Sequence, residues 1–170
     1  MTRANAGNAA GAWEQLARGA NQYSQDTQET GELLHLISLR LAGTTYAVRV
    51  ESVREIVRMR PITPIPRVDA AVRGVISLRG EMVQVIDLRA RLRLPTIDPH
   101  RTSRIVVVHL PDGRVAGLLV DEIREVLRIA ADATLSPAGD AFAVDALCAC
   151  GEEFVSVLSL ERVLDLEGEA

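Results

Sequence analysis

The 170-residue chain is poor in aromatic residues: Phe, Trp and Tyr make up 3% of it, while apolar residue types together make up 48%. The core must therefore be built from Val, Leu, Ile and Ala. Aromatic rings are also the surfaces on which nucleic-acid bases stack, and a net charge of −4 offers no excess of cations to neutralise phosphates. We therefore expect no nucleic-acid partner.

Long apolar runs and a cysteine framework are lacking as well. The sequence has no stretch of about 18 apolar residues that could span a membrane, and no apolar signal-peptide core at its start. The two cysteines, Cys148 and Cys150, lie too close in sequence for a relaxed disulfide, which is typical of a reducing compartment. We expect a cytoplasmic protein that does not insert directly into a membrane.

Catalytic motifs are absent too. The sequence contains no G-x-S-x-G elbow, no H-E-x-x-H pair, no phosphate-binding loop and no dinucleotide fingerprint. Cys148 and Cys150 would point the same way from a strand, but a soft metal needs two further ligands and none is near in sequence. We expect no catalytic residue, no metal and no cofactor. An enzyme or small-ligand barrel is the rival hypothesis, and a thermal-shift screen with metals and metabolites would reveal it.

The clearest local pattern is a hairpin followed by a short helix. Two β-branched runs, Val75–Leu78 and Met82–Ile86, flank a connection in which Gly80 suits the positive φ of a tight turn. Leucines at helical spacing then follow Asp87, whose side chain can cap the first turn of a helix, and Pro95 ends that helix.

The second half of the chain repeats the first. Residues 43–58 align without a gap on residues 113–128 at an offset of 70, and residues 71–92 align on residues 143–164 at an offset of 72. A repeated unit of about 70 residues with several short strands predicts two similar small β-barrels. Because each barrel is too small for a generous core of its own, we expect the two to pack together.

The hairpin segment also carries a family resemblance. Residues 74–89, G-V-I-S-L-R-G-E-M-V-Q-V-I-D-L-R, resemble the signature of the CheW-type chemotaxis coupling proteins, and the likeness extends over about residues 33–166. The resemblance implies two intertwined five-stranded barrels of SH3-like topology. It also implies a non-enzymatic adaptor that couples the cytoplasmic tips of methyl-accepting chemoreceptors to the regulatory domain of a CheA-type histidine kinase at receptor arrays. The alternative within the family is a scaffold of a non-flagellar pathway, such as type IV pilus twitching motility or surface sensing.

We therefore expect a mainly β fold with two SH3-like five-stranded β-barrels related by internal duplication, short helices, and a C-terminal helix over 159–166. The first barrel would comprise mainly residues 45–95, and the second mainly residues 33–44 and 103–158, with an exchange of strands left open. Residues 1–32 would form a flexible N-terminal arm. Its Trp13 is either the anchor of a docking peptide or part of a tail without a role.

The resemblance also implies which residues meet partners. Glu55 and Arg79 fall on the family's Glu of V-x-E-I and Arg of L-R-G, a pair associated with receptor and kinase contacts. Val53 and Gly74 match family positions tied to coupling. In the segment G-L-L-V-D-E-I-R-E-V-L, Ile123 and Val126 match the family's aliphatic partner-binding surface. The expected partner-binding residues are Val53, Glu55, Gly74, Arg79, Ile123 and Val126.

Overall fold

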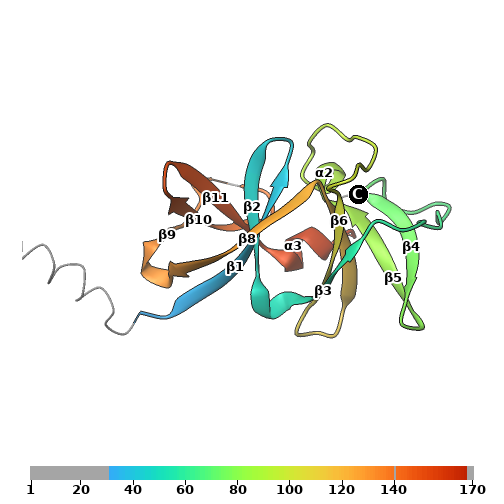
Figure 1. Cartoon of the computed structure of the whole chain (residues 1–170), viewed down its shortest axis with the longest axis horizontal. Helices are drawn as coiled ribbons and strands as arrows, with labels where there is room; N and C mark the ends of the chain where they lie inside the picture. The colour runs from blue at the N-terminus through green and yellow to red at the C-terminus, as the bar shows by residue number, and fades with distance from the viewer. Residues whose placement is uncertain (1–30, 140, 168–170) are drawn as a thin grey trace, which may run out of the picture. The chain divides into compact units, whose positions relative to one another are not determined.

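The computed structural model describes residues 31–139 and 141–167, so the expected arm, apart from residues 31 and 32, and Trp13 lie outside the described residues. The strands between residues 33 and 158 form two β-sheets, A and B, in which most neighbouring strands are antiparallel (Figure 1). Sheet A has the strand order β8 (Glu122–Ala130), β1 (Leu33–Leu41), β2 (Thr44–Arg49), β11 (Glu153–Leu158), β10 (Val144–Cys150) and β9 (Thr134–Leu135). Sheet B has the order β3 (Val53–Arg58), β6 (Arg104–His109), β7 (Val115–Val120), β5 (Glu81–Asp87) and β4 (Val72–Leu78). The mainly β fold with two SH3-like barrels is confirmed, and barrels A and B are named after their sheets.

Short helices follow the second hairpin of each repeat. They are α2 (Leu88–Arg91) and α3 (Leu160–Leu164), and two 3-10 turns, η2 (Val50–Ser52) and η3 (Ala131–Ala133), lie in the connections. The Asp87 carboxylate accepts hydrogen bonds from the amides of Arg89 and Ala90, as a cap should. Ser159, at the same position of the second repeat, caps α3. The predicted cap at Asp87 and the predicted C-terminal helix are therefore confirmed.

The repeats exchange their first hairpins. Strands β1 and β2 of the first repeat pair with the later strands of the second, while β6 and β7 pair with strands of the first. The predicted boundaries placed residues 33–44 in the barrel where β1 lies, and they left an exchange of strands open. They are wrong for the other strands of these hairpins, because residues 45–49 lie in barrel A and residues 104–120 lie in barrel B. Assignment by nearness in sequence failed here because each hairpin crosses to the other repeat's sheet.

The duplication extends to the pairing register. The parallel pair between β2 and β11 places Tyr46 opposite Ser156, and the parallel pair between β7 and β5 places Ala116 opposite Gln84. These positions correspond at offsets of 70 and 72. The two barrels are therefore built on one plan: barrel B combines a hairpin of the second repeat with three strands of the first, and barrel A combines a hairpin of the first repeat with four strands of the second, because the two-residue strand β9 is added to it.

The main core lies between the barrels, and alternate residues of the central strands explain it. On β6, Ile105 and Val107 belong to the interior cluster of barrel B, whereas Val106 and Val108 belong to the cluster shared with sheet A. A strand buried on both faces needs a continuous apolar run, which residues 105–108 supply. The barrels thus share apolar surface as expected, and Cys148 is a buried residue of barrel A's interior.

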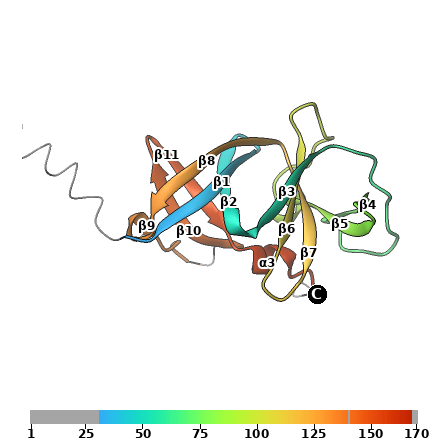
Figure 2. The same ribbon diagram turned by 60° about the horizontal axis from the view of Figure 1, so that its bottom comes forward.

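A buried arginine joins the two helices. Arg91, a residue that is 5% exposed, donates through its guanidinium to the carbonyl oxygens of Arg162, Val163 and Asp165 at the end of α3. It also lies 4.7 Å from the centre of the Phe142 ring. Carbonyls at a helix C-terminus lack partners within the helix, so this side chain caps α3, which Figure 2 shows next to the strands of sheet B. The cap fixes the C-terminal helix to the first repeat.

Candidate functional site

The tip of the β4–β5 hairpin carries an ion pair to strand β3. Arg79 and Gly80 form the two-residue connection with φ values of 51° and 82°, as in a type I′ turn. From this tip, the Arg79 guanidinium lies 3.0 Å from the Glu55 carboxylate; the Arg79 side chain is 79% exposed and that of Glu55 20%. The structure therefore brings together the two charged residues that the sequence nominated.

A second ion pair runs in the opposite sense beside the first. Arg54 on β3 donates to the Glu81 carboxylate at 3.0 Å, at the start of β5. Since β3 and β4 stand at the two ends of the strand order of sheet B, these contacts bridge the open side of barrel B at the hairpin tip. The result is a surface with alternating charges held in a fixed register.

Barrel A closes without the corresponding ion pair. At the repeat-related positions Glu125 replaces Glu55, but Gly151 stands in place of Arg79. Among the described residues, the Glu125 carboxylate forms no ion pair. Because barrel A has the same strand plan with glycine at this point, the barrel fold does not require the ion pair. The presence of Arg79 at the hairpin tip therefore needs an explanation other than folding.

Val53 and Ile123 occupy the same position of the two repeats, near the starts of the edge strands β3 and β8. Both are half-buried against the core cluster between the barrels. Gly74 is different. It is buried at a β-bulge with φ of 141°, and a Cβ there would lie 2.1 Å from the carbonyl oxygen of Thr63. Gly74 is therefore buried and has no side chain to offer a partner, and its inclusion among the partner-binding residues stays a prediction. Its conformation lets the backbone of Thr63 pair with Val75.

Exposed apolar side chains come in repeat-related pairs. Val126 on β8 is 59% exposed, and Ile56, its counterpart on β3, is 40% exposed. Met82 and Phe154, counterparts at an offset of 72, are both 68% exposed. The sequence prediction included Val126 but missed Ile56, Met82 and Phe154. The signal was available, because outward positions of both repeats hold large apolar residues.

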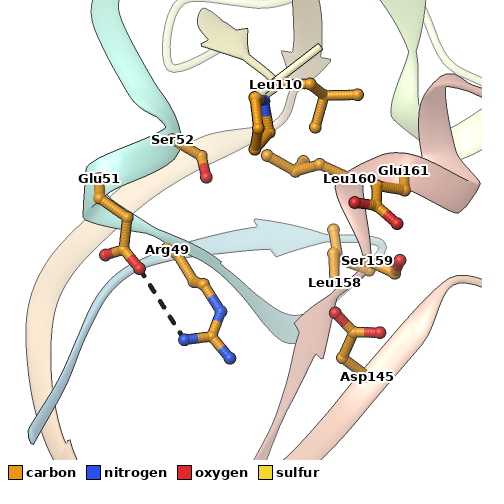
Figure 3. A pocket seen from close by; sticks show the side chains of 10 residues that line it. Arg49, Glu51, Ser52, Leu110, Asp145, Leu158, Ser159, Leu160 and Glu161 are labelled. Carbon is orange, nitrogen blue, oxygen red and sulfur yellow. Dashed lines mark ion pairs between the residues drawn. The ribbon is translucent and has the colours of Figure 1, made fainter.

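An open groove of about 410 Å³ lies where β2 passes into β3. Figure 3 shows Glu51, Asp145 and Glu161 around it, with Arg49 3.8 Å from Glu51. Its apolar lining comes from Leu158, Leu160, Leu110 and Pro111.

The residues that correspond to Glu51 and Glu161 of this groove in the other repeat are Asp121 and Arg89, and these two form an ion pair. Arg89 binds Asp121 through two hydrogen bonds of 2.8 and 2.6 Å, and Asp121 also accepts the amide of Ala42. Burial is the largest single effect on the Asp121 carboxyl and raises its pKa. The hydrogen bonds from Arg89 and Ala42, together with the positive charges of Arg89 and His100, outweigh it, so the pKa lies below its usual value. The hydrogen bond to Asp121 also raises the pKa of Arg89. This pair joins α2 to the crossing between the sheets.

The described residues contain no group of three or more His, Cys, Asp or Glu side chains placed to hold a metal ion. No helix in the same part of the chain is long and apolar enough to cross a membrane. Cys148 and Cys150 are both free thiols, and burial raises the pKa of Cys148.

Comparison with known proteins gives the family. The family model described as the CheW-like domain matches residues 35–168, almost the whole described fold. The chain belongs to the CheW-like domain family. Proteins of this family are non-enzymatic scaffolds, so the expectation that the chain is not an enzyme is confirmed by its membership.

Similar proteins support this assignment. The chain is 35% identical over 105 residues to the chemotaxis protein CheW of Rhizobium meliloti (strain 1021), covering 62% of this chain and 66% of that protein. It is 37% identical over 101 residues to the chemotaxis protein CheW of Bacillus subtilis (strain 168), covering 59% and 63%. The chain thus spans slightly under two thirds of the length of these relatives. The crystal structure of the scaffolding protein TtCheW from Thermoanaerobacter tengcongensis aligns with a TM-score of 0.76 and 27% identity over 81% of this chain and 97% of that one.

Proposed function

We propose that the chain is a chemosensory adaptor that couples methyl-accepting chemoreceptors to a CheA-type histidine kinase in chemotaxis. Support comes from its family, from similar proteins named as chemotaxis CheW proteins, and from a structural relative described as a scaffolding protein. The proposed location is the cytoplasm, at receptor arrays, with the receptor's cytoplasmic tip and the kinase regulatory domain as partners.

The observation that carries the proposal is the Glu55–Arg79 ion pair. The Arg79 side chain of this pair is mostly exposed, and barrel A has the same arrangement of strands without an ion pair at this position. An exposed ion pair contributes only about 0–1 kcal/mol to folding, whereas charges desolvated in an interface set register and specificity. The pair therefore fits a partner contact better than a structural role.

An adaptor also needs separate faces for separate partners. In the proposal, Val53, Glu55 and Arg79 contribute one face along β3 and the hairpin tip. Ile123 and Val126 contribute an aliphatic face along β8, the edge strand of the other sheet. Gly74 would act indirectly, by fixing the backbone around Thr63 against β4.

The test is biolayer interferometry with the regulatory domain of a CheA-type kinase encoded in the same genome. Val126→Arg should weaken binding at least about tenfold, which is about 1.4 kcal/mol, because the charge would be buried without a partner. Leu135→Arg is the matched control, since Leu135 is 64% exposed on the opposite edge strand of the same sheet. Equal losses for both variants, or no binding by the unmodified chain, would remove the proposed function.

A further inference from the structure

A basic hollow lies on barrel B where β3 ends and β6 begins. It measures about 430 Å³ and is lined by Arg58, Met59, His100, Arg101, Ser103 and Arg104. Three arginines and a histidine line it, and no Asp or Glu of the described residues does, in a chain whose net charge is −4. The hollow is therefore a local reversal of the protein's overall charge.

The arginines of this hollow are not used to hold the fold together by ion pairing. Arg58 and Arg104 stand directly opposite each other in the β3–β6 ladder, an arrangement of like charges that destabilises a sheet. Arg104 donates through Nη1 to the carbonyls of Arg101 and Ser103. Within residues 31–139 and 141–167, none of the three guanidinium groups has a carboxylate partner.

A buried hydroxyl adds a further donor. Ser103 is 3% exposed, and its Oγ accepts a hydrogen bond from the amide of His100 at 2.9 Å. In the described part of the chain, the hydroxyl donates to no acceptor, although a hydroxyl has one proton to give. Buried polar groups normally use their hydrogen-bonding capacity, and Ser103 is one of the residues that line the hollow, so an acceptor bound there would complete the hydrogen bonding of this hydroxyl.

We propose that the hollow is an oxyanion site that takes a phosphoryl group. Guanidinium groups bind phosphate oxygens through paired, charge-assisted hydrogen bonds. A phosphoryl dianion offers three acceptor oxygens and about −1.5 to −2 charges, which matches three arginines and a free hydroxyl. A single carboxylate would be satisfied by one guanidinium and would leave the like charges of Arg58 and Arg104 unrelieved. The proposal does not rest on the adaptor function, because it uses neither Glu55, Arg79 nor the β8 face.

The experiment is isothermal titration of the full chain with inorganic phosphate at constant ionic strength, held with chloride. We expect saturable binding in the millimolar range or tighter, and a thermal midpoint that rises with phosphate by mass action. Arg58→Gln should weaken binding about tenfold or more. Without phosphate, the same variant should keep or raise the thermal midpoint, because it removes the like-charge pair. Arg128→Gln, at the repeat-related position on the exposed face of β8, should change neither.

A second arm identifies the source of the phosphoryl group. Tighter binding of N-acetyl-O-phosphoserine amide than of inorganic phosphate supports a phosphorylated side chain of a partner, and the reverse order supports a free phosphate compound. The proposal is overturned if phosphate binding is unsaturable, if Arg58→Gln binds as well as the unmodified chain, or if an acetylated triglutamate peptide binds more tightly than either phosphate probe. The last outcome would assign the hollow to an acidic polypeptide segment.

Discussion

Replacing Arg79 should separate folding from partner binding. The Arg79→Gly variant takes the residue that the second repeat already has, Gly151, and it removes a side chain held at a φ of 51°. Relief of the left-handed conformation is worth about 1–2 kcal/mol. Two effects act in the opposite direction. Glycine makes the unfolded chain more flexible, which lowers stability by about 0.4–1 kcal/mol, and the loss of the exposed ion pair lowers it by about 0–1 kcal/mol. We therefore expect a free energy of unfolding within about 1 kcal/mol of the unmodified chain, measured by urea denaturation.

Partner binding by the same variant should fall much further. If the Glu55–Arg79 pair becomes desolvated in a complex, truncation of one member costs about 2–5 kcal/mol, largely because the other charge is stranded. The loss in affinity for the kinase regulatory domain or receptor tip would then be about 30-fold or more.

A double variant tests this reasoning. Adding Glu55→Gln to Arg79→Gly should restore part of the affinity, because no charge is then stranded. Arg114→Ala, which removes an exposed arginine that is ion-paired with Asp112 just before β7, is the control and should bind normally. Two results would refute the reasoning: a free energy of unfolding of Arg79→Gly that is lower than that of the unmodified chain by more than about 2 kcal/mol, or partner binding that Arg79→Gly leaves unchanged.

Two further predictions concern the fold that holds these surfaces. Gly74→Ala should lower the free energy of unfolding in urea by about 1–3 kcal/mol, because the new Cβ meets the Thr63 carbonyl; Gly31→Ala, with open space around it, should be neutral, and equal effects would contradict the account. Asp121→Asn should cost about 1–3 kcal/mol at pH 7 by weakening the bond to Arg89. Since the folded pKa of Asp121 is depressed, its contribution is complete above the unfolded pKa of about 3.9 and is lost as pH falls through the folded value. Denaturation at a series of pH values should therefore show the difference between the Asp121→Asn variant and the unmodified chain disappear under acid conditions, and a difference that persists at low pH would contradict this origin.

The hairpin, the helix caps and the duplication were predictable from sequence because each depends on local chemistry or on self-similarity. Gly80 adopts the positive φ expected of it, and Asp87 caps α2. The exchange of hairpins was not predictable in detail. The two repeats have equivalent apolar patterns, so strand β1 suits β8 or β3 equally well on pattern alone, and only the structure shows that it pairs with β8.

The candidate site was predictable to a different extent. Glu55 and Arg79 were named as partner-binding residues from the family resemblance, and the structure adds that their side chains form an ion pair with each other. The burial of Gly74 did not follow from that resemblance, because it depends on Thr63, within the proline-rich connection, pairing with Val75 of β4. The basic hollow escaped the sequence analysis for a similar reason, since Arg58 and Arg104 lie far apart in sequence and meet only through the β3–β6 ladder.

The most direct test of the adaptor function is a three-component sedimentation assay. Receptor cytoplasmic fragments displayed on vesicles are mixed with the CheA-type kinase from the same genome, with and without the full chain. The account predicts that the kinase sediments with the vesicles only when the chain is present, and that Arg79→Gly and Val126→Arg each reduce its recovery while Leu135→Arg does not. Equal sedimentation of the kinase in the absence of the chain, or a chain that binds one partner but never bridges both, would contradict it.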